Sequence, residues 1–215
     1  LRGDNATTQQ AIRTALDEFR ILNNQTGAAR CYNMLGSLAT RQGNMERSQK
    51  LRERSLKLFR KADNTQGIAD VLNNMGATAA DVGEYEKALN YYQESYELRL
   101  QLGERFGIGM SLSNMGMVFA RLGQYTAAWV SLEKGMEYYQ EISYREGIAW
   151  VYNELGIVAT KQEEYARAND LIRKSLTLLK AQQNPEATAW SYKSLGFLEL
   201  ATGDIDAALI HFGHC

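Results

Sequence analysis

Asparagine side chains recur just before a Leu-Gly or Met-Gly pair, at Asn33, Asn73, Asn74, Asn114 and Asn153. A side-chain amide carries both a hydrogen-bond donor and an acceptor, so a ladder of amides can bond the backbone of an extended peptide whatever its sequence. The alternative is that these amides are solvated or support neighbouring turns. The sequence leaves both explanations open.

Three cations recur at a second position, five residues after the glycine of the same pair, at Arg41, Arg121 and Lys161. Cations in line suit an acidic or carboxylate-bearing partner, and an arginine can grip a carboxylate with two hydrogen bonds. Cations near the C-terminus of a helix also interact favourably with its dipole. We favour the dipole explanation here.

Two further lines of residues become more apolar toward the C-terminus. Six residues before each glycine the series is Arg30, Asp70, Met110, Trp150 and Trp190, and one residue after it the series is Ser37, Ala77, Met117, Ile157 and Phe197. If these positions face a groove, its later half is an apolar wall typical of a partner-binding site. The alternative is that further repeats cover them.

Other sets of residues do not predict a nucleotide-binding, metal or catalytic site. The stretch from Gly103 to Gly109 is glycine-rich, but a nucleotide-binding fingerprint requires a preceding strand. His211, His214 and Cys215 are too few to predict a metal site, and two histidines at one end of the chain cannot supply a catalytic triad. We therefore expect no catalytic residue, no metal and no cofactor.

The elements that must position these residues repeat every 40 positions. Glycines at Gly36, Gly76, Gly116, Gly156 and Gly196 are followed seven residues later by Gly43, Gly83, Gly123, Glu163 and Gly203. Self-similarity at such a period predicts a solenoid of stacked units. We expect the first glycine of each unit to allow close contact between helices, and the second to end a helix in a left-handed conformation. Glu163 should then carry a steric penalty, or its turn should differ.

Apolar spacing predicts a pair of helices in each unit. The expected helices cover 9–22, 28–42, 45–62, 67–82, 85–102, 106–122, 125–142, 147–162 and 165–181, with a fifth pair beginning at Pro185. The domain prediction is the second helix of a preceding repeat at 1–26, then repeats at 27–66, 67–106, 107–146, 147–186 and, incomplete, 187–215, all in one solenoid. Because the chain is entered and left inside repeats, we expect a piece of a longer protein.

Composition favours a soluble folded protein. Hydrophobic residues make up 45% and charged residues 23%, and a net charge of -1 gives no sign of nucleic-acid binding. No apolar run approaches the length of a membrane span and no leader is present. We expect a cytoplasmic protein that does not bind membranes, with Cys31 and Cys215 reduced.

The repeated phrase resembles the tetratricopeptide repeat over essentially the whole chain. The matching residues are Tyr152, Leu155, Gly156, Ala159, Tyr165 and Ala168 in one unit, and Leu72, Met75, Gly76, Ala79, Tyr85 and Ala88 in another. The period departs from the family's length of about 34 residues, and the proline that ends each family unit is missing. The longer form is similar to kinesin light chains, Leu-Gly-Asn-repeat polarity proteins and the sensor arrays of bacterial ATP-dependent regulators.

This resemblance implies an all-α, right-handed superhelical solenoid of antiparallel helix pairs whose first helices line a concave groove. It implies a scaffold or sensor domain that binds a protein or peptide segment within a larger signalling or transcription-regulatory protein. One alternative is a spacer or oligomerisation array that packs on its own copy along the side from Trp150 to Trp190. Another is a regulatory phosphatase built on helical repeats.

Overall fold

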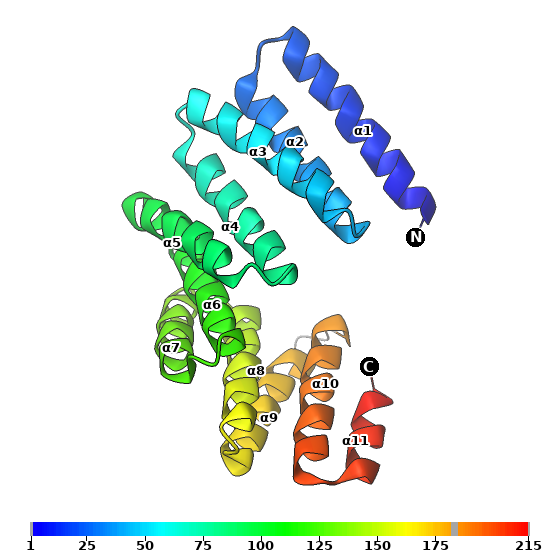
Figure 1. Cartoon of the computed structure of the whole chain (residues 1–215), viewed down its shortest axis with the longest axis vertical. Helices are drawn as coiled ribbons and strands as arrows, with labels where there is room; N and C mark the ends of the chain where they lie inside the picture. The colour runs from blue at the N-terminus through cyan, green and yellow to red at the C-terminus, as the bar shows by residue number, and fades with distance from the viewer. Residues whose placement is uncertain (1, 182–184, 215) are drawn as a thin grey trace. The chain divides into compact units, whose positions relative to one another are not determined.

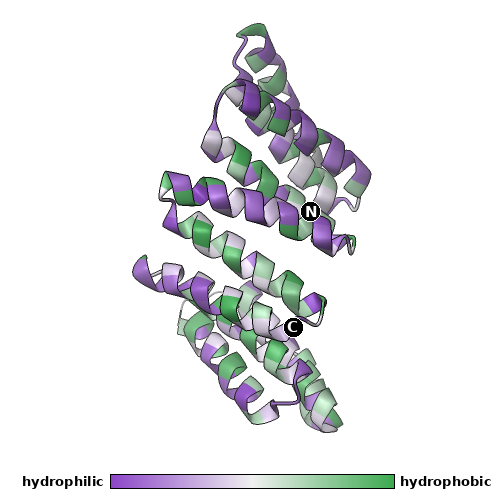
Figure 2. Cartoon of the chain, turned by 60° about the vertical axis from the view of Figure 1, so that its left-hand side comes forward, coloured by the Kyte–Doolittle hydropathy of each residue, from purple (hydrophilic) through white to green (hydrophobic). Residues whose placement is uncertain are grey.

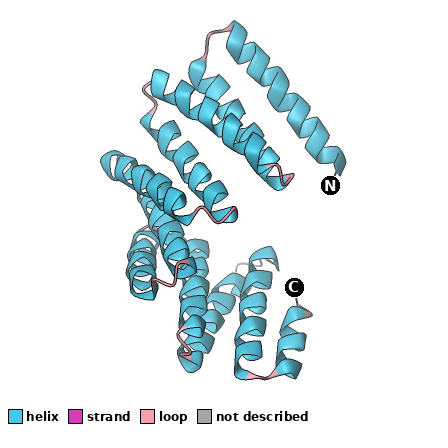
Figure 3. Ribbon diagram, viewed as in Figure 1, coloured by secondary structure: helices cyan, strands magenta, loops and turns pink. Residues whose placement is uncertain are grey.

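Short turns join consecutive helices within each of the two ranges that the computed structural model describes, residues 2–181 and 185–214 (Figures 1 and 3). In that part of the chain there are eleven helices and no strand, which confirms the all-α prediction. The helices are α1 (Arg2–Ile21), α2 (Gln25–Arg41), α3 (Met45–Lys61), α4 (Thr65–Asp81), α5 (Tyr85–Leu102), α6 (Arg105–Arg121), α7 (Tyr125–Glu141), α8 (Arg145–Lys161), α9 (Tyr165–Ala181), α10 (Pro185–Thr202) and α11 (Ile205–Phe212). Within the described ranges, none of these helices is both long and apolar enough to cross a bilayer.

The helices form two compact units, Leu1–Glu104 and Arg105–Cys215, called unit 1 and unit 2 below. In unit 1, α2 packs along α3 and α4 along α5, and α1 packs against α2. In unit 2 the pairs are α6 with α7, α8 with α9, and α10 with α11. The predicted pairing of helices is therefore present in both units.

Helix starts recur every 20 residues, from Gln25 and Met45 through to Pro185 and Ile205. Each 40-residue repeat thus consists of two helix-turn segments of equal length. The first helices begin one to three residues earlier than predicted, and at α2 and α4 an asparagine before the helix acts as its cap. The Asn64 side chain, for example, accepts a hydrogen bond from the backbone N–H of Gly67 at 2.7 Å, so α4 already begins at Thr65.

The turns share one left-handed residue at the same position. Gly43, Gly83, Gly123 and Gly203 have positive φ, as predicted, and so does Glu163 at +64°. After Glu163, the N–H of Glu164 bonds to the carbonyl of Ala159 at 2.9 Å, which is the bond that closes a Schellman motif. The Glu163 turn therefore keeps the glycine geometry, so the alternative of a different turn is wrong and the steric penalty stays a prediction.

Close helix contact explains the glycines inside the first helices. A Cβ on Gly116 would lie 2.6 Å from the Leu132 side chain and 3.2 Å from the Ala128 carbonyl oxygen on α7. A Cβ on Gly156 would lie 2.4 Å from Ile172 on α9. The loss of helix propensity at these glycines, about 1 kcal/mol each, is offset by packing that a larger residue would prevent.

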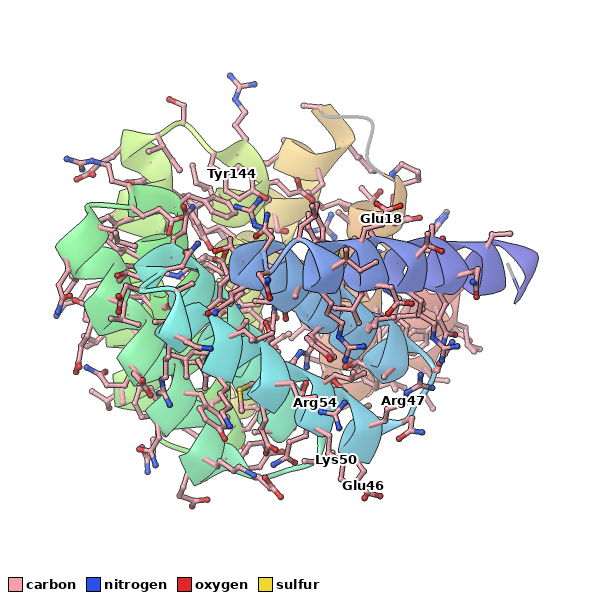
Figure 4. The ribbon with its side chains drawn as sticks, turned by 90° about the horizontal axis from the view of Figure 1, so that it is seen from above. Glu18, Glu46, Arg47, Lys50, Arg54 and Tyr144 are labelled. Atoms are coloured by element: carbon pink, nitrogen blue, oxygen red, sulfur yellow. The ribbon has the colours of Figure 1, made fainter. Side chains whose placement is uncertain are left out.

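The first helices form one layer of each unit. In unit 1, α4 lies against α2, and in unit 2, α8 lies against both α6 and α10. Among the described helices, the backbones of successive second helices lie farther apart, and α3 reaches α5 only through long side chains, as in the ion pair of Arg60 with Glu94 at 2.9 Å. The first helices, whose backbones lie close together, form the inner layer of each unit. Side chains on the open face of this layer therefore converge. Figure 2 shows that α4 is more apolar than its second-helix neighbours α3 and α5, whose outer faces carry surface ion pairs such as Lys50 with Glu46 at 2.5 Å (Figure 4).

Two buried arginines distinguish the second helices of unit 1. Arg99 on α5 is 1% exposed and pairs with Asp70 at 2.8 Å and with Glu104 at 2.9 Å. Arg52 on α3 is 4% exposed and donates to the hydroxyls of Thr78 and Ser37, but its Nε has no hydrogen-bond partner among the described residues. The residues equivalent to Arg52 in the other repeats are apolar or aromatic: Tyr92, Leu132, Ile172 and Phe212.

Candidate functional site

A cavity of about 540 Å³ opens on the inner layer of unit 2, between α6, α8 and α10. We call it the cationic cavity. Its charged side chains come one from each helix, and its apolar wall comes from α8 and α10. The lining residues are Arg121, Lys161, Lys193, Ile157, Trp190, Phe197, Asn153, Thr160, Ser194 and Ala201.

Positive charge dominates the cationic cavity. Arg121, Lys161 and Lys193 are all exposed, and none of the described lining residues is a carboxylate. Glu154 lies next to Arg121, but burial raises the pKa of its carboxyl to about 7, an effect that the Arg121 charge and a hydrogen bond with Asn153 reduce only in part. Near neutral pH much of Glu154 is therefore protonated and does not cancel the charge of the cations.

Asn153 is the most deeply placed polar residue of this cavity. The residue is 6% exposed, and its Oδ1 has no hydrogen-bond partner among the described residues. A buried acceptor left unpaired costs free energy, so a donor that reaches it contributes favourably. Such a donor is either the N–H of a ligand or a water in the void of about 10 Å³ between Asn153, Ser175 and Ser191, a volume that suits one water.

A second cavity, of about 210 Å³, adjoins the first and shares Trp190 with it. We call it the aromatic cavity. Five of its lining residues carry aromatic rings. The lining residues are Phe106, Tyr139, Tyr144, Trp150, Trp190, Met110, Ser113, Asn114, Glu146 and Gly147.

The structure brings most of the predicted unit 2 residues together. Asn153, Arg121, Lys161, Trp190 and Phe197 line the cationic cavity. Asn114 and Trp150 line the aromatic cavity, and Met117 is half-buried on α6 outside the lining of both.

Sequence reasoning missed several lining residues. Lys193 was detectable, because it occupies the position of Asn33, Asn73 and Asn153 in the last repeat. Phe106, Tyr139 and Tyr144 lie on α6, on α7 and in a turn, so no single helical line of residues connects them.

The predicted residues of unit 1 are placed differently. Asn74 Nδ2 on α4 donates to Asn33 Oδ1 on α2 at 3.3 Å, so these two amides bond each other. Asn73 is buried at 5% exposure, and Arg41 is exposed at the end of α2. At least part of the amide series in unit 1 therefore links helices.

Comparison with protein families gives a match that covers most of the chain. The tetratricopeptide-repeat model matches residues 25–101 and 107–181, so both units are included. The chain belongs to the tetratricopeptide-repeat family. Its repeats are the long, 40-residue form predicted from the glycine spacing. Comparison with curated proteins gave no match.

Several solved structures share the arrangement of these repeats. BtubC (BKLC) from P. vanneervenii has a TM-score of 0.78 at 16% identity, over 97% of this chain and 88% of that one. The Rap conjugation gene regulator of plasmid pLS20, in complex with the Phr* peptide, has a TM-score of 0.79 at 17% identity, over 98% of this chain and 56% of that one. Aspartyl phosphate phosphatase F from Bacillus subtilis has a TM-score of 0.81 at 13% identity, over 94% and 53%. At these identities the likeness concerns the fold alone, and the chain spans little more than half the length of the last two proteins.

Proposed function

We propose that this chain is a cytoplasmic, non-enzymatic binding domain that holds a protein or peptide segment against the inner layer of unit 2. The observation that carries the proposal is the cationic cavity, in which three cations surround an apolar wall and a buried, unpaired amide oxygen. A cavity of this size and mixed lining is typical of ligand-binding sites. A similar fold has been solved with a bound peptide, which supports the same class of ligand here.

The lining defines the chemistry of the ligand. A carboxylate fits beside Arg121, Lys161 and Lys193, and a bulky apolar side chain fits against Phe197. A backbone N–H of the ligand supplies the donor that Asn153 Oδ1 lacks. The expected ligand is therefore an extended acidic segment with at least one large apolar residue. The chain itself would bind it as part of a larger signalling or transcription-regulatory protein.

The test is selection of peptides from a random display library with the purified chain, followed by titration of the enriched peptides. Enriched peptides should combine acidic and bulky apolar residues. Arg121→Glu should weaken their binding about tenfold or more, because it reverses one charge of the cavity. The matched control is Lys134→Glu, which reverses an exposed cation on the second helix α7. Equal affinities for both variants would refute the proposed site.

Self-association through α10 and α11 is the alternative with structural support. Trp190 is 54% exposed, Leu209 64% and Ile210 63%, so this end of unit 2 presents apolar side chains. Light scattering over a concentration series separates the two functions, since a monomer at all concentrations excludes self-association. The regulatory phosphatase alternative is tested by an assay of phosphoryl hydrolysis, which should stay at background.

A further inference from the structure

The aromatic cavity gathers rings from separate parts of unit 2. Phe106 belongs to α6, Tyr139 to α7, Trp150 to α8 and Trp190 to α10. Tyr144, which is labelled in Figure 4, is the N-cap residue of α8. Phe106 is 42% exposed and Trp190 54%, so the cavity is reachable from solvent. Aromatic residues make up half of its lining.

The rings hold one another in fixed positions. The Phe106 and Tyr144 rings are 5.1 Å apart at 74°, and the Tyr139 and Tyr144 rings are 5.3 Å apart at 65°. Edge-to-face packing of this kind stabilises each ring. The part of the wall formed by Phe106, Tyr139 and Tyr144 is therefore preformed.

Only negative charge is present in this wall. Glu146 is the one described lining residue with a formal charge, and its Oε2 accepts a hydrogen bond from the Tyr144 hydroxyl at 3.4 Å. Burial and the nearby Glu146 charge raise the pKa of the Tyr144 phenol, so it stays protonated. Aromatic faces and a carboxylate together attract a cation. A neutral apolar ligand group would instead desolvate the Glu146 carboxylate and bring no positive charge of its own, which is unfavourable.

We propose that the aromatic cavity binds a cationic side chain of the partner segment, either a lysine ammonium or an arginine guanidinium. This inference rests on the proposed function and extends it. Because Trp190 lines both cavities, the ligand carries its basic residue close to the acidic residue held by Arg121 and Lys161. The two cavities together then select ligands by the order of their acidic and basic residues as well as by their amino-acid composition.

The first test uses small probes on the full 215-residue chain: blocked lysine, arginine and norleucine amides, followed through the indole N–H signals in NMR spectra. Trp150 and Trp190 line the cavity, whereas Trp129 donates to Gln162 on another face and serves as the internal control. The lysine and arginine amides should shift the Trp150 and Trp190 signals saturably and leave Trp129 unchanged. Norleucine, which lacks the charge, should bind about fivefold more weakly. Equal binding of norleucine and of both cationic amides, or no saturable shift, would overturn the inference.

The second test uses variants with a matched control. Glu146→Gln and Trp190→Ala should each weaken the cationic amides about fivefold, measured at Trp150. Glu137→Gln, which removes an exposed carboxylate on α7, should not. If Glu146→Gln and Glu137→Gln behave alike, the inference is wrong.

These titrations can be separated from the test of the proposed function. Amide binding does not use Arg121 or Lys161, so it can succeed when peptide selection fails, and that result would refute only the proposed function. Peptide binding that depends on Arg121, without any preference for cationic amides, would refute only the aromatic site.

Discussion

The Asn74 amide on α4 donates to the Asn33 side-chain oxygen on α2 at 3.3 Å, and this bond joins the two first helices of unit 1. Both side chains are half-buried, so water competes with the bond only in part. An amide series that the sequence suggests for a ligand therefore also acts between the helices themselves.

We expect a double-mutant cycle on Asn33→Ala and Asn74→Ala to show a coupling of about 1 kcal/mol in the free energy of unfolding, measured by urea denaturation. Each single change should cost a similar amount, since it leaves one amide without its partner. Strictly additive effects would mean that the two amides do not interact in solution.

Glu163 provides a prediction about the turns. It adopts φ +64° at the position where other repeats have glycine, so Glu163→Gly should raise the free energy of unfolding by about 1 kcal/mol. The control is the reverse substitution, Gly123→Glu, at a turn where φ is +74° and an added Cβ meets no atom within 4 Å. That change should cost about the same amount through backbone strain alone. Thermal unfolding of both variants measures the effect, and two changes of the same sign would contradict this explanation.

Replacement of each buried arginine by methionine should change the free energy of unfolding differently. Arg99→Met removes the partner of Asp70 and Glu104 and should lower the free energy of unfolding by about 1 to 2 kcal/mol, since both carboxylates remain partly hydrated. Arg52→Met should be neutral or stabilising, because burial lowers the pKa of its guanidinium and its hydrogen bonds are to hydroxyls.

Denaturant unfolding of the two arginine variants under identical conditions gives the comparison. A loss of stability in Arg52→Met as large as that in Arg99→Met would show that the Arg52 hydrogen bonds outweigh the cost of burying its charge.

The raised pKa of Glu154 leads to a prediction that the stability of the chain depends on pH. Its pKa rises from 4.5 to about 7 in the folded chain, so between these pH values the folded state holds a proton that the unfolded state has released. The contribution of Glu154 to the free energy of unfolding is therefore full below pH 4.5 and falls as pH rises through 7, by about 3 kcal/mol.

The measurement is the difference in the free energy of unfolding between Glu154→Gln and the parent chain at several pH values. Glutamine cannot ionise, so the variant should gain relative stability as pH rises from 4.5 to 8. The matched control is Glu137→Gln on α7. A Glu154→Gln difference that stays constant with pH would show that the carboxyl is not protonated in the folded state.

Short-range patterns in the sequence were sufficient to predict most of the fold. The left-handed turn at Gly123 and the close contact of Gly116 with α7 depend on residues within a few turns of one another, so the spacing of glycines predicts both. Helix starts were less accurate, since caps such as Asn64 are polar residues that also suit a loop.

The candidate site was predicted only in part. Trp150 and Trp190 are 40 residues apart on successive first helices, and the repeat alone places them in one line. Tyr139 belongs to a second helix, and Tyr144 to a turn, so their place beside Trp150 follows from how α7 packs against α8.

The sequence by itself determined the period, the helix pairs and the left-handed turns, because each depends on short-range geometry that recurs every 40 residues. Only the tertiary structure decided which side chains surround a cavity, which amides bond each other and which carboxyl is protonated near pH 7. These properties depend on burial and on distances between helices, and helix packing sets both.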